Sequence, residues 1–354
     1  MQDGVNSRWV IHLAFMLAAI CSSQEITTAS TQTQDQIDLK RVLTWLPADT
    51  ETLLVANGPF RVSNFGGQQH EYKNHELTTE ELEEYFEGLT LSLFGSGKGI
   101  LEKHLRGTRV LFALEGSRHF RPPADLGELP FEGATLAVFE EDLDDRRDAF
   151  MKEAAHVAVR IEQIEGQKVA VFEEQWEKDV WTIFITFPKQ DVVIVATNER
   201  FLQETLARMQ GAKGERAFPE SSREWKYLNG QTQFWGIRHY DKLQAKSDPT
   251  SPFGGRKSAN FPDEEAVGMT YQCDPKTERR ATLTYLAGPR GQTRKIAEER
   301  FPDAGEVEQK AQLHIQYREL EPGVIQSIFD LTHSQAADLF FFVFMMHLGH
   351  GIYV

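Results

Sequence analysis

Cysteine, basic charge and long apolar runs are all scarce in this sequence. The chain has 2 cysteines in 354 residues, so a scaffold held together by disulfides is excluded. Acidic residues outnumber Lys and Arg by 53 to 38, which gives a formal net charge of −15. A field of that sign repels phosphate backbones and anionic lipid, so we expect no nucleic-acid partner. No apolar run reaches the roughly 18 residues of a membrane-spanning helix, and we expect no span in the mature chain.

The motifs of common catalytic and metal sites are also missing. There is no GxSxG elbow, no HExxH and no CxxC. The stretch LFGSGKGI, residues 93–100, resembles a phosphate loop, but Ser92 and Gly99 stand where a Walker A motif needs Gly and then Ser or Thr. EEDLDD, residues 140–145, lacks the alternating ligands of a calcium loop and is typical of a helix start. We therefore predict no catalytic residue, no metal ligand and no cofactor, while a triad assembled from distant segments stays an alternative.

The N-terminus resembles an export signal. Arg8 precedes an apolar run over residues 10–20, which has the length of a secretory signal core and is too short to span a bilayer. Cys21 and Ser23 place small residues three and one positions before Gln24, so cleavage is predicted between Ser23 and Gln24. A cut after Cys21, or a lipid anchor on Cys21, is the alternative. Cleavage leaves a single cysteine in a mature chain exported to the periplasm or the extracellular medium.

Beyond the signal peptide at residues 1–23, the chain divides into a tether and two halves. Residues 24–36 are rich in Thr and Gln without an apolar period, which indicates a flexible tether. The polar, Gly-containing residues 211–223 mark a boundary between a half at 37–212 and a half at 213–354. Both halves mix short helices with strands, so a divergent duplication into two related halves is an open prediction.

Helices are predicted where apolar residues recur at intervals of three and four. Residues 78–94 open with Thr78 and Glu81 at the spacing of a capping box. Asn198 is expected to be the N-cap of the amphipathic stretch that follows it. A further helix is expected from Pro322 onwards. The others are expected at residues 37–46, 144–157, 223–228 and 293–300.

Strands are predicted from continuous or alternating apolar runs. The run at residues 52–57 is expected to end at Gly58-Pro59. Short turns at Glu165-Gly166 and Lys189-Gln190 leave no room for crossover connections, so the neighbouring strands must be antiparallel. The fold class is therefore α+β, with antiparallel sheets and helices packed on them. The other strands are expected at residues 108–116, 133–141, 157–166, 167–175, 180–188, 191–197, 232–241, 265–273, 281–288 and 311–320.

Two segments are candidates for binding. The stretch FWGIRHYD, residues 234–241, would present Phe234, Arg238 and Tyr240 on one face of a strand, and aromatic residues beside an Arg are common in interfaces. An ordinary half-buried strand is the alternative. The C-terminal run LFFFVFMMHL, residues 339–348, would reach only about 15 Å as a helix, half of a bilayer core. We expect it to be a docked helix or an interface for a protein partner.

Two segments also carry a resemblance. WLPADTETLLVANG, residues 45–58, and DVVIVATNERFLQETL, residues 191–206, resemble the pattern of exported bacterial proteins of unknown function, in which a signal sequence, LPADT and a strand precede a later strand-then-helix. The resemblance implies an exported α+β protein and no catalytic residue. The predicted function is an exported, non-enzymatic envelope or periplasmic module that binds a protein or ligand. The alternatives are a hydrolase with a dispersed site and a structural protein without a small ligand.

Overall fold

The computed structural model describes residues 38–62, 76–90, 97, 99–119, 131–176, 179–239, 266–276, 280–287, 314–337 and 339. The first elements in chain order are α2 (Leu39–Trp45), β1 (Thr52–Arg61), α3 (Thr79–Thr90), α4 (Ile100–Leu105), β2 (Arg109–His119), β3 (Phe131–Phe139), α5 (Asp144–Val157), β4 (Arg160–Ile164) and β5 (Gln167–Trp176). They are followed by β6 (Asp179–Lys189), β7 (Val192–Ala196), α6 (Glu199–Met209), the 3-10 helix η2 (Arg223–Tyr227), β8 (Phe234–His239), β9 (Ala266–Cys273), β10 (Ala281–Ala287), β11 (His314–Glu321) and β12 (Val324–Asp330).

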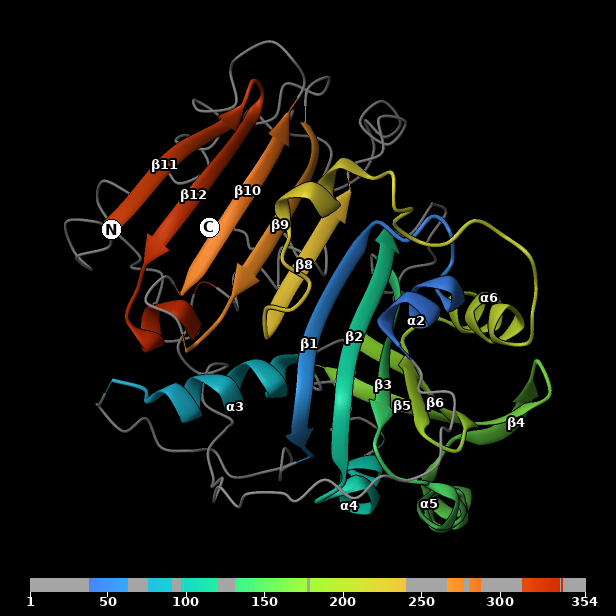
Figure 1. The fold of residues 1–354 in the computed structure, drawn as a ribbon. Helices are drawn as coiled ribbons and strands as arrows, with labels where there is room; N and C mark the ends of the chain where they lie inside the picture. The colour runs from blue at the N-terminus through green and yellow to red at the C-terminus, as the bar shows by residue number, and fades with distance from the viewer. Residues whose placement is uncertain are drawn as a thin grey trace, which may run out of the picture.

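The strands form one 12-stranded sheet with the order β11-β12-β10-β9-β8-β1-β2-β3-β7-β6-β5-β4. Figure 1 shows this series sweeping from β11 at the upper left to β4 at the right. Every neighbouring pair is antiparallel. The predicted α+β class, an antiparallel sheet with packed helices, is therefore confirmed.

The two predicted halves contribute the two sides of this sheet. β1, β2 and β3 are consecutive neighbours on one side, and β8, β9 and β10 are consecutive neighbours on the other. On the first side, β7 comes last in the chain and pairs with β3. On the other side, β12 comes last and pairs with β10. The sides meet where β1 pairs with β8. A duplication that relates the halves stays a prediction.

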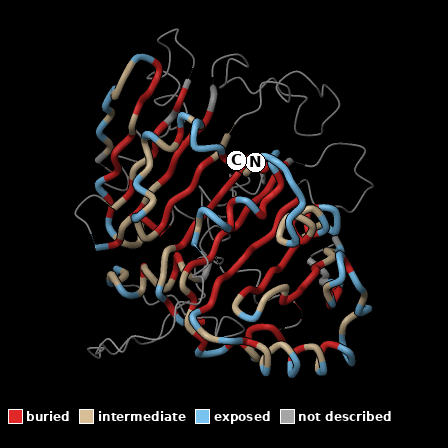
Figure 2. The backbone as a smooth tube through the Cα atoms, turned by 45° about the vertical axis from the view of Figure 1, so that its right-hand side comes forward, coloured by how far each residue is buried: buried red, intermediate tan, exposed pale blue. Residues whose placement is uncertain are grey.

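Helices cover both faces of the sheet, and Figure 2 shows the buried strands between them. The first face carries Leu54 and Ala137, and the side chains of α3, α4 and α5 pack on it. The second face carries Leu53 and Leu136, and α2 and α6 pack on that side. Because successive residues of a strand point to opposite faces, both cores draw on the same strands.

The predicted helix starts are confirmed at two positions. Thr78 N donates to Glu81 Oε2 at 2.8 Å, and Glu81 N donates to Thr78 Oγ1 at 3.2 Å, which is a reciprocal capping box. Asn198 Oδ1 accepts from Phe201 N at 3.1 Å, so it caps α6. Short-range sequence therefore determines where α3 and α6 begin.

Two predicted boundaries are wrong. β1 does not end at Gly58-Pro59 but continues to Arg61, and a register shift after Asn57 accommodates the proline, which has no amide proton. Gly58 is needed there because a Cβ would lie 2.4 Å from the Val110 carbonyl oxygen. The helix expected from Pro322 is also wrong, because residues 324–330 form β12 and pair with β11 in a hairpin. A helix begins only at residue 333.

Several predictions fall outside the described residues. These are the signal peptide, the tether, the helix at 293–300 and nearly all of the apolar run at 339–348. Within the described ranges, no helix combines the length and the apolarity needed to cross a membrane.

Candidate functional site

A cavity of about 450 Å³ lies on the second face, where elements from both halves of the chain meet. Its wall comes from the start of α2, the segment before η2, η2 itself, and the turn that leads into β8. The residues that line it are Asp38, Leu39, Lys40, Leu43, Arg216, Glu220, Trp225, Gly230, Gln231 and Trp235.

Two tryptophans form the aromatic part of this wall. The rings of Trp225 and Trp235 meet edge to face, with centroids 5.8 Å apart and an interplanar angle of 68°. Trp235 is fully buried, whereas Trp225 is half-buried. Trp225 Nε1 donates to the carbonyl oxygens of Phe218 and Pro219 at 3.1 and 3.0 Å, which fixes the plane of its ring. A flat apolar surface is therefore held in one orientation.

Charged side chains surround this apolar wall in balanced numbers. The guanidinium of Arg216 lies over the Trp225 ring, 5.8 Å from its centroid, and Arg216 Nη1 donates to Glu220 Oε1 at 3.3 Å. Lys40 Nζ lies 3.9 Å from the same Glu220 oxygen. Asp38 caps α2 by accepting from Arg41 N at 2.8 Å. Two acids and two bases therefore line the cavity, which favours a ligand without a large net charge.

A hydrogen-bonded turn holds the wall opposite α2. Asn57 Nδ2, from β1, donates to the carbonyl oxygens of Gly230 and Thr232 at 2.8 and 2.7 Å. From the other side, Gln272 Oε1 accepts from Asn229 N at 2.9 Å. Because β1 and β9 both hold the turn, the cavity is largely formed before any ligand arrives.

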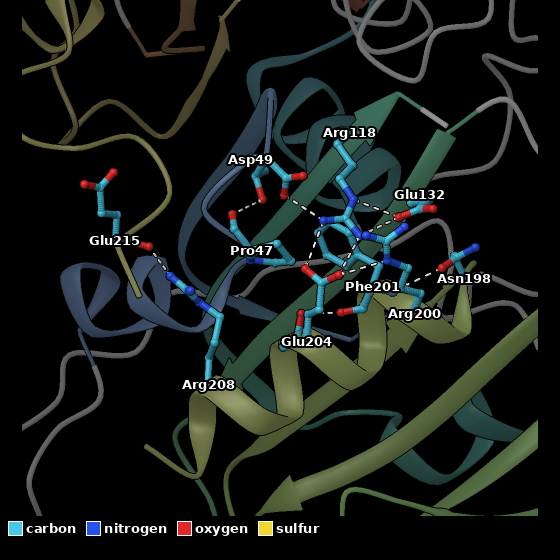
Figure 3. A network of polar contacts seen from close by, with 12 residues as sticks. Pro47, Asp49, Arg118, Glu132, Asn198, Arg200, Phe201, Glu204, Arg208 and Glu215 are labelled. Atoms are coloured by element: carbon cyan, nitrogen blue, oxygen red, sulfur yellow. Dashed lines mark hydrogen bonds and ion pairs between the residues drawn. The ribbon is translucent and has the colours of Figure 1, made fainter. Parts of the chain in front are cut away.

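A second polar cluster surrounds Arg118 of β2, and Figure 3 shows carboxylates converging on its guanidinium. Arg118 is 7% exposed, and it donates to Glu132 at 2.7 Å, to Asp49 at 2.6 Å and to Glu204 at 3.0 and 3.1 Å. The guanidinium also lies 5.4 Å from the centroid of the Phe201 ring.

The hydrogen bonds of this cluster shift the pKa values of the arginine and of its carboxylate partner in opposite directions. Burial alone lowers the pKa of Arg118, but its hydrogen bonds to the three carboxylates raise it above the ordinary value. The hydrogen bond from Arg118 lowers the pKa of Glu204. The cluster joins the turn after α2, β2, β3 and α6 and engages all three guanidinium nitrogens, so we assign it a stabilising role.

A third arrangement pairs a histidine with a buried carboxylate. His239 Nδ1 lies 2.6 Å from Glu224 Oε1, and the Glu224 side chain is 1% exposed while that of His239 is 44% exposed. A carboxylate in this position orients the imidazole and sets its tautomer, as in the base of a catalytic triad.

Burial raises the pKa of the Cys273 thiol, so this cysteine is a poor nucleophile. Among the described residues, no group of His, Cys, Asp or Glu could hold a metal ion.

The predicted site residues are only partly described. Phe234 is fully buried on the first face, where its ring lies 4.6 Å from that of Phe86. Arg238 is half-buried. Tyr240 and the cleavage residues Ser23 and Gln24 lie outside the described residues, so the binding face and the cleavage site stay predictions.

No pattern in the sequence predicted the cavity. Trp235 neighbours Phe234 in the stretch chosen for a binding face, but it points to the opposite face of the sheet and lines the cavity. The available signal was a pair of tryptophans ten positions apart, Trp225 in η2 and Trp235 in β8, with a turn between them. Leu39 and Leu43 complete the cavity from about 190 residues away in the chain, which no local pattern reveals.

Among the residues that the structure describes, the cavity offers a place for binding and the Glu224–His239 pair offers a group for proton transfer. No protein-family model, no curated protein and no solved structure matches this chain, so their geometry carries the functional inference.

Proposed function

We propose that this chain is an exported, non-enzymatic binding module whose ligand site is the cavity between α2 and the turn before β8. The observation that carries the proposal is the pair Trp225 and Trp235 in the wall of a cavity of about 450 Å³. Small-molecule sites usually have volumes of about 300–1,000 Å³, with apolar and aromatic walls and a few polar groups. Export is supported by the signal-like residues 1–23.

The lining favours a compact ligand with a flat apolar part and hydrogen-bonding groups at its edge. The half-buried indole of Trp225, together with the half-buried Leu39, offers apolar surface that a ligand would remove from water. Glu220 and Arg216 already bond each other, so they are better suited to orient neutral polar groups than to capture a strongly charged ligand.

A cavity-filling variant tests this proposal. Gly230 lines the cavity, and a Cβ at this position would meet no atom within 4 Å. Gly230→Leu should therefore fold normally and occupy space that the ligand needs. The matched control is Gln203→Leu, which adds an apolar side chain at an exposed position of α6, outside the lining.

The measurement is a screen of small amphipathic compounds by tryptophan fluorescence and thermal shift. We expect compounds that bind the native chain and the Gln203→Leu control but bind Gly230→Leu at least tenfold more weakly. Equal binding by both variants would place the ligand site elsewhere. A native chain that binds none of the compounds would contradict the small-ligand form of the proposal.

The hydrolase alternative is favoured by one observation, the Glu224–His239 pair. Its test is activity on ester, peptide and glycoside panels, with His239→Asn and Glu224→Gln as variants. Activity in the native chain that both substitutions lower, while circular dichroism stays unchanged, would establish a catalytic role. Activity that survives His239→Asn would remove this histidine from any mechanism.

A further inference from the structure

The outermost strand at one end of the sheet, β4, exposes apolar side chains. It is the last strand in the sheet order and pairs with β5 on its inner side, which leaves its outer edge at the rim in Figure 1. Val159 and Ile161 are 54% and 40% exposed. Val157, at the end of α5, is exposed beside them. The outward-facing backbone N–H and C=O groups of an edge strand are a template for pairing with another strand, and exposed apolar side chains on that strand favour the pairing.

The polar residues of β4 alternate with these apolar ones. Arg160 and Glu162 share the opposite face of the strand from Ile161. Arg160 Nε lies 3.0 Å from Glu162 Oε2, and Arg160 Nη2 lies 3.3 Å from Glu162 Oε1. The two side chains are 43% and 30% exposed. The edge therefore carries one positive and one negative charge on either side of an exposed isoleucine.

We propose that β4 is a self-association edge, on which the β4 strand of a second copy of this chain pairs in the antiparallel direction with Ile161 at the two-fold axis. In this register Arg160 of each copy faces Glu162 of the other, and the two Ile161 side chains face each other. The contact is the same patch on both copies, so it closes as a dimer.

Charge selects this register over its neighbours. A shift by one residue in the pairing would place apolar residues of one copy opposite charged residues of the other, on mismatched faces. A shift by two would bring Arg160 opposite the same arginine of the second copy, or Glu162 opposite the same glutamate, and like charges directly opposite are destabilising. Of these registers, the one centred on Ile161 places both Arg160 and Glu162 opposite a residue of the other charge.

The centre of the sheet already contains a junction of this geometry. β1 and β8 pair in the antiparallel direction with Leu54 opposite Gly236.

The dimer contact is small, because β4 is only 5 residues long, and the net charge of −15 opposes association of two copies. We therefore expect a weak dimer whose population rises with protein concentration.

The test uses two charge-reversed variants of the full chain, singly and mixed. Arg160→Glu leaves two acidic residues on the edge and Glu162→Arg leaves two basic residues, so each variant alone should lose the dimer. An equimolar mixture should restore it as a heterodimer, because each acidic position then faces a basic one. Lys213→Glu, at an exposed position in the segment after α6 and outside β4, is the control for the charge change.

Analytical ultracentrifugation at physiological ionic strength gives the readout, with a monomer mass of 40.4 kDa. The expected result is dimer in the native chain and the control, monomer in each variant alone, and dimer in the mixture. A native chain that stays monomeric at high concentration would overturn the proposal. A dimer that survives both single variants would also overturn it, and so would growth beyond the dimer, which would indicate open-ended joining of β4 to β11.

Discussion

Leu54 of β1 and Gly236 of β8 pair at the point where the two halves of the chain join into one sheet. The backbone hydrogen bonds on either side of this pair repeat each other. Asn57 N donates to the residue three positions before Gly236, and His239 N donates to the residue three positions before Leu54, both at 2.7 Å. The junction is therefore symmetric in its hydrogen bonds. It joins the strands of the half at 37–212 and those of the half at 213–354 into one continuous sheet.

The side chain of Asn57 stabilises this junction and the cavity together. Asn57→Ala removes its bonds to the carbonyl oxygens of Gly230 and Thr232, so the free energy of unfolding should fall by about 1–3 kcal/mol. Urea denaturation measures this change. Gln203→Ala, at an exposed position of α6, should change stability by less than about 0.5 kcal/mol. Similar effects of the two substitutions would show that the junction does not depend on Asn57.

The Arg118 cluster should be far more sensitive than a surface ion pair. Arg118→Ala leaves the buried carboxylate of Glu132 without its partner and should cost about 3–5 kcal/mol. Arg200 also contacts Glu204, but its side chain is 70% exposed, so Arg200→Ala should cost less than about 1 kcal/mol. Guanidinium denaturation compares the two variants. A small loss in Arg118→Ala would contradict the stabilising role of the cluster.

Lowering the pH should reduce the free energy of unfolding of the native chain more than that of Arg118→Ala. The pKa of Glu204 is lowered in the folded state, so its contribution is present above the unfolded pKa and is lost as pH falls through the folded pKa. Removal of Arg118 removes the cause of that shift. The difference in unfolding free energy between the native chain and Arg118→Ala should therefore shrink as pH falls below about 4.5. A constant difference over this range would exclude the linkage.

Glu115, on the first face of the sheet, should produce the opposite pH dependence. Burial raises its pKa to about 8, so the folded state holds a proton that the unfolded state loses at a pKa of 4.5. The contribution of Glu115 to the free energy of unfolding is fully present below the unfolded pKa. As pH rises, it falls by about 1.4 kcal/mol per pH unit until the folded pKa is reached. Glu115→Gln should flatten this slope between those two pKa values. Glu173→Gln, at an exposed position of β5, should leave the slope unchanged.

The cap of α6 gives a prediction of moderate size. Asn198→Ala removes the acceptor for Phe201 N and should lower the unfolding free energy by about 1 kcal/mol. Asn198→Asp keeps an acceptor oxygen and should cost much less. Thermal unfolding of the two variants measures the difference. Equal losses would mean that packing, and not the cap, holds the start of the helix.

The sequence by itself determined the elements whose causes are local. The capping box at Thr78 and Glu81, the cap at Asn198 and the tight turn at Glu165-Gly166 depend on residues within a few positions of each other. Alternating apolar runs likewise determined the strands and the α+β class, because one residue in two must face a core. Local rules failed at Pro59 and after Pro322, where pairing with a neighbouring strand outweighed the tendency of proline to end or begin an element.

Only the tertiary structure decided the strand order, the cavity and the place of β4 at the end of the described sheet. Hydrophobic periodicity states which residues are buried but not which strand lies beside which, so the pairing of β1 with β8 had no signal in either segment. The cavity needs Leu43 and Trp235 on one face of a sheet, and their separation of about 190 residues hides that relationship. The exposure of Ile161 was likewise undetermined, because an apolar strand in the middle of a sheet and one at its edge have the same pattern until the neighbours are known.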